Sequence, residues 1–216
     1  MSDNLFVLSE GNSIGNQFLF ELRDKKVQID RMRFRRNLER LGEILAYEIS
    51  KNLAYRESKF ETPLGQTSMP LLTQQPLLVT ILRAGIPFHH GFLNFFDHAD
   101  SGFIGAFREE GEAITVTVDY ASLPPLDGRT IILIDPMLAT GRSIVEAHKL
   151  LLRKGTPRHV YIVSVVAAPE GIGLVRKSLS TPYSVWTCAV DEKLNSSYYI
   201  VPGLGDAGDL SFGVKT

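Results

Sequence analysis

The residues best suited to chemistry lie between positions 131 and 143. An apolar run ends in an acid, Asp135, and a short loop of small and hydroxyl residues then leads to Ser143. Glu146 follows three positions later, the spacing of a capping box, which predicts that a helix begins at Ser143. The free backbone N–H groups and positive dipole end of such a helix favour a phosphate in the loop. The loop is not a nucleoside-triphosphate P-loop, because it lacks the pattern Gly-x-x-x-x-Gly-Lys.

Hydroxyl and carboxylate groups flank this predicted phosphate cradle. Thr140 and Ser143 can donate hydrogen bonds from their hydroxyls, and Asp135 can accept hydrogen bonds from sugar hydroxyls. Taken alone, a plain strand-to-helix turn with a good cap explains the pattern better. In the tail, three glycines at 203, 205 and 208 let backbone approach a flat ligand closely, with an ordinary surface loop as the alternative.

Apolar strands that alternate with short helices must position these residues. Strands are predicted at 77–82, 102–107, 114–118, 130–134, 160–166 and 183–190, and helices at 32–51, 87–96, 143–153 and 171–178. The turn-rich stretch 61–76 reads as a connection. This alternation is typical of an α/β fold with a mainly parallel sheet covered by helices on both faces. Ligands of such sheets bind at the carboxyl ends of the strands, where Asp135 is expected.

Length and charge narrow the class of protein. The 216 residues point to one domain, and a net charge of −1 argues against nucleic-acid or membrane-surface partners. The single cysteine, Cys188, excludes an internal disulfide and suits a reducing compartment. Residues 1–10 lack the pattern of a secretory signal, and the longest apolar stretch, 160–168, is far shorter than the roughly 20 residues of a bilayer span. A cytoplasmic protein is expected.

Several motifs together resemble one enzyme family. Residues 131–143, with Asp-Pro-Met-Leu-Ala-Thr-Gly, resemble the 5-phosphoribosyl 1-diphosphate (PRPP) loop of type I phosphoribosyltransferases, and of uracil phosphoribosyltransferases in particular. The tail, 199–209, is similar to that family's uracil-binding segment. Further likenesses lie, in the family's order, at 22–25, 45–48, 81–85, 107–110 and 167–171.

The resemblance implies a type I phosphoribosyltransferase domain over 1–216, with a helical N-terminal arm (1–60), an α/β core (77–190) and a base-binding tail (191–216). It implies a glycosyltransferase that converts uracil and PRPP to UMP and diphosphate in pyrimidine salvage. Mg²⁺ is expected as the cofactor, held mainly through PRPP rather than by protein ligands. A homodimer or higher homo-oligomer is expected.

The family's roles carry over where residues match. Arg83 and Arg108 are implied at PRPP, whose phosphates need cations that a near-neutral chain must supply locally. The implied catalytic residues are Asp135, Arg108 and Asp206. The implied PRPP-binding set is Arg83, Arg108, Asp135, Pro136, Met137, Leu138, Ala139, Thr140, Gly141, Arg142, Ser143 and Asp206. The implied uracil-binding set is Ile200, Gly205, Asp206 and Ala207.

The chain departs from the family's pattern in places. Arg142 stands where a second glycine is usual, and Asp119, Ala121 and Ser122 replace a more aromatic and basic pattern. These departures leave open the role of Arg142 and the contacts of a lid, a hairpin around 114–120 expected to close over PRPP and exclude water.

Alternatives and weaker signals complete the interpretation. Two alternative functions remain open, a pyrimidine-responsive RNA-binding regulator of the same fold and a phosphoribosyltransferase for another base.

The only basic cluster in the sequence comprises Arg31, Arg33, Arg35, Arg36 and Arg40. It is predicted to be a solvated helix face or a subunit contact. A binding site for a regulatory nucleotide such as GTP is the minority alternative. His89, His90 and His98 are predicted to be surface or interface residues rather than metal ligands.

Overall fold

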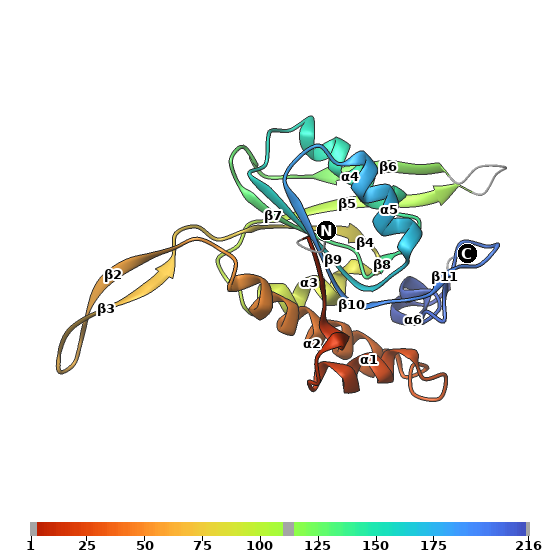
Figure 1. Cartoon of the computed structure of the whole chain (residues 1–216), viewed down its shortest axis with the longest axis horizontal. Helices are drawn as coiled ribbons and strands as arrows, with labels where there is room; N and C mark the ends of the chain where they lie inside the picture. Colours follow the sequence, from red (N-terminus) through yellow and green to blue (C-terminus); the bar gives the residue numbers. More distant parts are fainter. Residues whose placement is uncertain (1–3, 110–114, 215–216) are drawn as a thin grey trace.

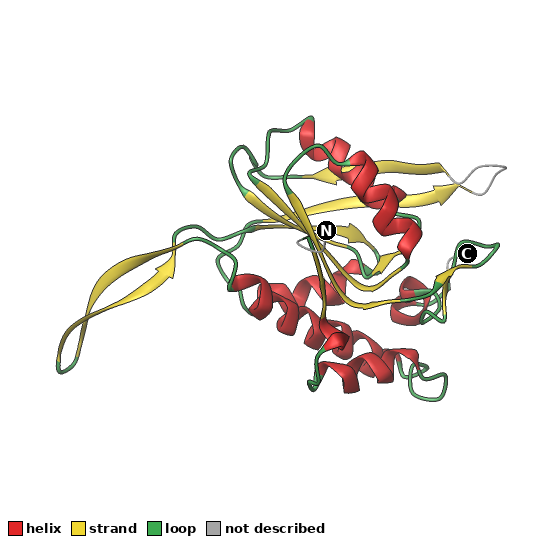
Figure 2. Ribbon diagram, in the orientation of Figure 1, coloured by secondary structure: helices red, strands yellow, loops and turns green. Residues whose placement is uncertain are grey.

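The computed structural model describes residues 4–109 and 115–214, and for residues 106–109 and 115–119 it describes the backbone alone. At its centre lies an eight-stranded sheet in the order β1-β10-β9-β7-β4-β5-β6, with β8 paired to β9 (Figures 1 and 2). Its strands are β1 (Leu5–Val7), β4 (Leu77–Leu82), β5 (Ser101–Glu109), β6 (Thr115–Ser122), β7 (Thr130–Ile134), β8 (Met137–Leu138), β9 (His159–Ala167) and β10 (Tyr183–Val190). The pairings are parallel, except that β5 and β6 are antiparallel.

Helices cover both faces of this sheet, as the sequence predicts (Figure 1). One face carries α1 (Gly15–Arg23), α2 (Arg31–Ser50) and α3 (Gly85–Leu93), and the other carries α4 (Arg142–Leu152) and α5 (Pro169–Ser178). A short 3-10 helix, η1 (Leu8–Glu10), joins β1 to α1. The apolar side of α2, including Phe34 and Leu38, belongs to one buried cluster, and Ile144 and Leu151 of α4 belong to the other.

The segment predicted as a connection at 61–76 is different in the structure. There, β2 (Tyr55–Thr62) and β3 (Gly65–Leu72) form an antiparallel hairpin that projects away from the body (Figure 1). The prediction was wrong because the exposed strands lack a continuous apolar run, and because Pro63 and Pro70 suggested turns throughout. Pro70 is tolerated since this ribbon has two edge strands, where a missing N–H donor costs little.

The start of α4 also corrects the sequence prediction. The helix begins at Arg142, and its N-cap is Gly141 in the left-handed conformation, with φ of 79° and no side-chain cap. Ser143 is therefore the second helical residue, and its capping box with Glu146 does not form. Gly141 can adopt this left-handed conformation without steric cost because glycine has no Cβ.

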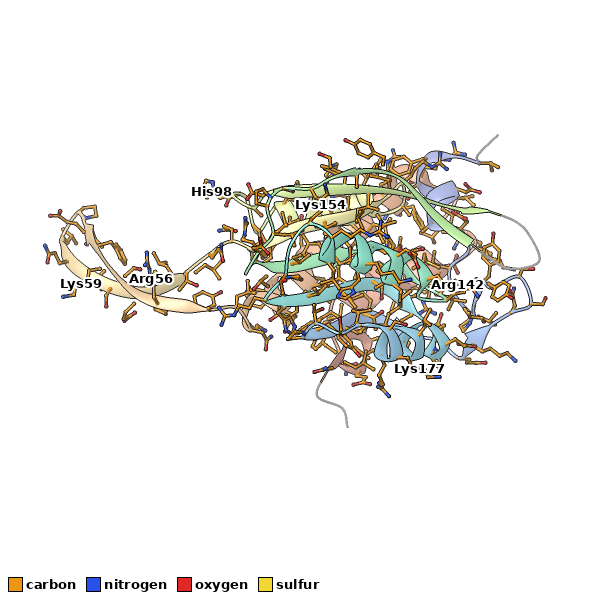
Figure 3. All side chains as sticks on the ribbon, turned by 90° about the horizontal axis from the view of Figure 1, so that it is seen from above. Arg56, Lys59, His98, Arg142, Lys154 and Lys177 are labelled. Carbon is orange, nitrogen blue, oxygen red and sulfur yellow. The ribbon has the colours of Figure 1, made fainter. Side chains whose placement is uncertain are left out.

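His89 corrects the prediction of a surface histidine. It lies on α3 and is 2% exposed, with Nε2 3.2 Å from Ser101 Oγ and its ring 5.4 Å from that of Phe103. Burial, with a smaller contribution from neighbouring His90, lowers the pKa of His89 from 6.5 to about 4. His98, in contrast, is exposed on the surface (Figure 3).

The low pKa of His89 predicts a loss of stability in acid. The unfolded chain binds a proton below pH 6.5 and the folded chain does not until about pH 4, so stability falls as pH falls through that window. Between pH 7 and pH 5, His89→Gln should lose about 2 kcal/mol less unfolding free energy than the wild type. Urea unfolding at each pH measures this, and His98→Gln should keep the wild-type slope. Identical slopes for wild type and His89→Gln would contradict the prediction.

Candidate active site

The first part of the loop between β7 and α4, residues 135–138, is hydrogen-bonded to β9 and to Ala168 directly after it. The backbone N–H of Asp135 donates to Val163 O at 3.1 Å, and its Oδ1 accepts from Met137 N at 3.2 Å. Pro136 O accepts from Val165 N at 2.9 Å, and Ala168 N donates to Leu138 O at 2.9 Å. These bonds hold the predicted phosphate loop at the carboxyl edge of the sheet.

Two glycines bring this loop into backbone contact with the first turn of α5. A Cβ on Gly171 would lie 2.7 Å from Leu138 O and would also clash with Ala139 O. A Cβ on Gly141 would lie 2.7 Å from Gly171 O. The motif at 167–171 and the loop at 135–143 are therefore one packed unit, which fixes the start of α4 at the sheet edge.

Arg142 occupies the first helical position, so the departure from glycine requires no positive φ at this residue. Its backbone N–H donates to Thr140 Oγ1 at 3.4 Å. Figure 3 shows Arg142 at the end of the molecule opposite Arg56 and Lys59 of the β2–β3 hairpin. The positive φ that this turn requires is adopted by Gly141, so no second glycine is needed at position 142.

Arg83 follows β4 at the same edge of the sheet, after a cis peptide bond between Leu82 and Arg83. Its Nη2 donates to Gly213 O at 3.1 Å and lies 3.4 Å from Asp209 Oδ1. These contacts join the end of β4 to α6 (Ala207–Phe212) in the tail.

Arg108 lies on β5, paired with Val116 of β6, and its side chain falls outside the description. The predicted hairpin around 114–120 is confirmed at the backbone level from Thr115 onward, whereas Ile114 and the side chain of Asp119 lie outside the described part. Ala121 and Ser122 pair with Ile104 and Phe103 of β5.

The tail forms a small folded segment next to the carboxyl edge of the sheet. It contains β11 (Lys193–Leu194), β12 (Ile200–Val201) and a cis bond between Val201 and Pro202. Gly203 (φ 61°) and Gly205 (φ 94°) take conformations that favour glycine, and a Cβ on Gly203 would clash with Ile200 O. Asp206 is the N-cap of α6, its Oδ1 accepting from Asp209 N at 2.9 Å. The glycine-rich tail is thus an ordered structure rather than a loose surface loop.

The loop, Arg83 and the tail are brought together. Glu170 Oε1, on the first turn of α5, accepts from Leu194 N of β11 at 3.0 Å, and this backbone hydrogen bond lowers the pKa of Glu170. Because Gly171 packs against the loop and Leu194 pairs with Ile200, this hydrogen bond connects the loop at 135–143 with the tail at 200–207 through α5 and β11. Helix N–H groups, a carboxylate, a guanidinium and glycine-rich tail backbone suit an anionic sugar phosphate and a flat ring.

The sequence analysis did not identify a group of residues whose side chains hydrogen-bond to the backbone of the tail. Asp191, 8% exposed, directly follows β10, and its carboxylate accepts from Arg23 of α1 and from Gly203 N. Gln28 Nε2 donates to Leu204 O at 3.2 Å, and Arg35 Nη1 donates to Ser211 O at 2.8 Å. An acid immediately after a buried strand was the available signal for Asp191.

Three more arginines of α2, at positions 33, 36 and 40, have partners in this chain. Arg36 Nη1 lies 2.7 Å from Glu39 Oε1, which raises the pKa of Arg36, and Arg33 Nη1 lies 3.4 Å from Glu21 Oε2. The Arg40 guanidinium lies 4.9 Å from the centre of the Phe18 ring.

The described residues contain no cluster of three or more His, Cys, Asp or Glu side chains that could hold a metal ion. Within the same described ranges, no helix is long and apolar enough to cross a membrane.

Comparisons with known proteins agree on one family. A family model described as uracil phosphoribosyltransferase matches residues 16–214. A uracil phosphoribosyltransferase of Porphyromonas gingivalis is 42% identical over 210 residues, covering 96% of this chain and 97% of that protein. One of Methanothermobacter thermautotrophicus is 39% identical over 187 residues, covering 86% of each. The solved structure of an Aquifex aeolicus protein has a TM-score of 0.88 at 31% identity, covering 98% of this chain and 99% of that one.

The close approach at Gly171 predicts a selective effect of an added methyl group. Gly171→Ala should destabilise the protein by about 1–3 kcal/mol, because the new Cβ meets two backbone carbonyls that cannot move independently. Gly173→Ala on the same helix meets nothing within 4 Å and should be neutral or stabilising by about 0.5–1 kcal/mol. Urea unfolding of both variants measures the difference. Equal stabilities would show that the loop and α5 are not in backbone contact.

Proposed function

The chain belongs to the uracil phosphoribosyltransferase family, and from that premise we propose that it transfers the phosphoribosyl group of PRPP to uracil, giving UMP and diphosphate. The observation that carries the proposal is the meeting of two substrate-type segments at one sheet edge. Support comes from the first turn of α5, which packs on the loop at Gly171, and from β11, which pairs with Ile200 of the tail, because Glu170 Oε1 and Leu194 N connect these two elements. In this role the protein is a salvage glycosyltransferase.

PRPP binds at the loop in this proposal. Backbone N–H groups at the start of α4, with the hydroxyls of Thr140 and Ser143, hold the 5-phosphate at the positive end of the helix dipole. Asp135 accepts hydrogen bonds from the ribose hydroxyls, which are stronger to an ionised acceptor. Pro136 to Ala139 shape the loop, and Arg142 adds positive charge at its edge.

Uracil binds at the tail. Its flat ring carries alternating donors and acceptors, which the backbone of Ile200 and of Gly205 to Ala207 can match. The left-handed conformation of Gly205 supports this role, since backbone without a side chain can approach a ring closely. Asp206 caps the start of α6, and in this proposal it contacts both uracil and PRPP.

The reaction needs no covalent nucleophile. The bond from ribose C1 to diphosphate breaks, the bond from uracil N1 to C1 forms, and the N1 proton leaves. Arg83 and Arg108 stabilise the charge that develops on the departing diphosphate. The tail aims N1 at C1, which converts an encounter of two substrates into a nearly unimolecular step.

Mg²⁺ is part of the proposal. The available donors fit an ion held chiefly by substrate oxygens, because Mg²⁺ retains waters and phosphates as ligands and needs only one or two carboxylates. In this proposal Asp135, at the loop where the ribose hydroxyls would lie, would be the protein carboxylate that contacts the ion. When bound, the ion neutralises charge on the diphosphate leaving group.

We also propose that the chain works as a homodimer or higher homo-oligomer, and the β2–β3 hairpin supports this. Cross-strand pairing puts Phe60, Met69 and Leu71 on one face of the ribbon and Lys59 and Glu61 on the other. The three apolar side chains are between 39% and 49% exposed. An isolated two-stranded hairpin is marginally stable in water, so an uncovered apolar face favours burial against a second copy.

We also propose a cytoplasmic location for the protein and consider its regulation by GTP. A cytoplasmic location is supported by Cys188, a free and buried thiol whose pKa is raised by burial. Regulation by GTP at the arginines of α2 is the minority alternative, because Arg33 and Arg36 already pair with acids.

A panel of bases tests the proposed function. With PRPP and Mg²⁺, the protein should convert uracil to UMP, and chelation of the metal should stop the reaction. Cytosine, hypoxanthine and orotate should react far more slowly, because the proposed tail contacts match the donors and acceptors of uracil and these bases carry different ones. Product formation is measured by chromatography. Turnover of another base but not uracil would overturn the base assignment, and specific RNA binding without catalysis would favour the regulator.

Substitutions on the two faces of the hairpin test the oligomer. Met69→Ser with Leu71→Ser should lower the solution mass toward that of one chain, because the apolar contact is lost. Lys59→Ser with Glu61→Ser, on the opposite face, should leave the mass unchanged. Light scattering after size exclusion measures the mass at micromolar concentration. A wild-type monomer, or an unchanged oligomer in the apolar-face variant, would contradict the proposed role of the hairpin.

A further inference from the structure

One buried carboxylate links three parts of the chain that are distant in sequence. Asp191 Oδ1 accepts from Arg23 Nη2 at 2.8 Å, and Oδ2 accepts from Arg23 Nη1 at 3.2 Å, a two-bond fork. The same Oδ2 accepts from Gly203 N at 2.8 Å. The Asp191 backbone N–H donates to Ala167 O at 2.8 Å. The carboxylate therefore contacts α1 and the tail while its backbone is fixed to β9.

The tail end of this link lies between the two proposed uracil contacts. Gly203 ends the turn that begins at Ile200, and Gly205 to Ala207 follow two residues later. Holding the amide of Gly203 fixes the turn relative to the sheet, and thus the spacing between Ile200 and Gly205.

The arm end of the link fixes the carboxylate itself. Arg23 is the last residue of α1, and the side chain of Asp191 is only 5% exposed, so Arg23 supplies the charge that makes its burial tolerable. The planar guanidinium also orients the carboxylate, because both of its oxygens are engaged by the fork. With Arg23 in place, Oδ2 points at Gly203 N.

We infer that Arg23 and Asp191 are positioning residues for the uracil-binding turn, acting through the amide of Gly203. This inference rests on the proposed function, since it assigns the pair to uracil rather than to PRPP. The hydrogen bonds of the two side chains described above run to each other and to Gly203, which belongs to the tail. Displacement of the turn should therefore weaken the use of uracil while leaving PRPP binding intact.

Kinetics of three variants test the inference. Asp191→Asn keeps an acceptor for Gly203 N but loses the charge-assisted fork, and should raise KM for uracil about tenfold with KM for PRPP changed less than about twofold. Arg23→Lys keeps the charge without the fork and should be affected less than Arg23→Met. Asp100→Asn is the matched control, because it breaks another arginine–aspartate pair, Arg129 Nη1 to Asp100 Oδ2 at 3.0 Å, before the start of β5. It should leave both KM values unchanged.

Amide hydrogen exchange gives a readout that does not depend on activity. In Asp191→Asn, exchange should accelerate in peptides covering 200–207 and stay unchanged in α4. If the wild type fails to use uracil, the proposed function fails, and faster exchange confined to 200–207 would still support the positioning link. Unchanged exchange in this segment would overturn the link, as would equal rises in both KM values.

Discussion

The structure depends on a buried charge at the carboxyl end of β10. Removing a carboxylate from water is costly, and it is tolerated at Asp191 because three N–H groups, two of Arg23 and one of Gly203, donate to it. Those donors come from the N-terminal arm and the C-terminal tail. The ion pair adds to the pairing of β1 with β10 and to the hydrogen bonds of Arg83 with the tail, and it connects the two ends of the chain at the edge where the parallel strands finish.

The other half of the site is built from close backbone contact rather than charge. Gly141 and Gly171 let the loop after β7 and the first turn of α5 approach until no Cβ would fit. The helix N-terminus so placed offers N–H groups to an anion, and Arg83 reaches the tail from the end of β4. A chain with a net charge of −1 must supply its cations locally, and in the proposed function Arg83 and the start of α4 do so where the diphosphate would leave.

The sequence predicted those parts of the fold that local pattern determines. The predicted bounds of strands β4, β7 and β10 agree with the observed ones. Strands that are buried on both faces are mainly apolar along their length, and this pattern can be recognised in the sequence. The β2–β3 hairpin was missed since exposed strands carry no such run, and the start of α4 was misplaced because Gly141 replaces a side-chain cap. The motifs located the loop and tail, but the pairing of Arg23 with Asp191 spans 168 positions, and neither residue's surroundings indicate the other.

In the proposed function, the loop at 135–143 and the tail at 200–207 form the two halves of one substrate site. A crystal structure of the protein with UMP tests it most directly, since UMP carries both a phosphate and the base. The account predicts the phosphate against the backbone N–H groups at the start of α4, with the ribose hydroxyls near Asp135. It predicts the uracil ring against the backbone of Ile200 and Gly205 to Ala207. A phosphate bound away from this loop, or a base that does not touch the tail, would contradict the account.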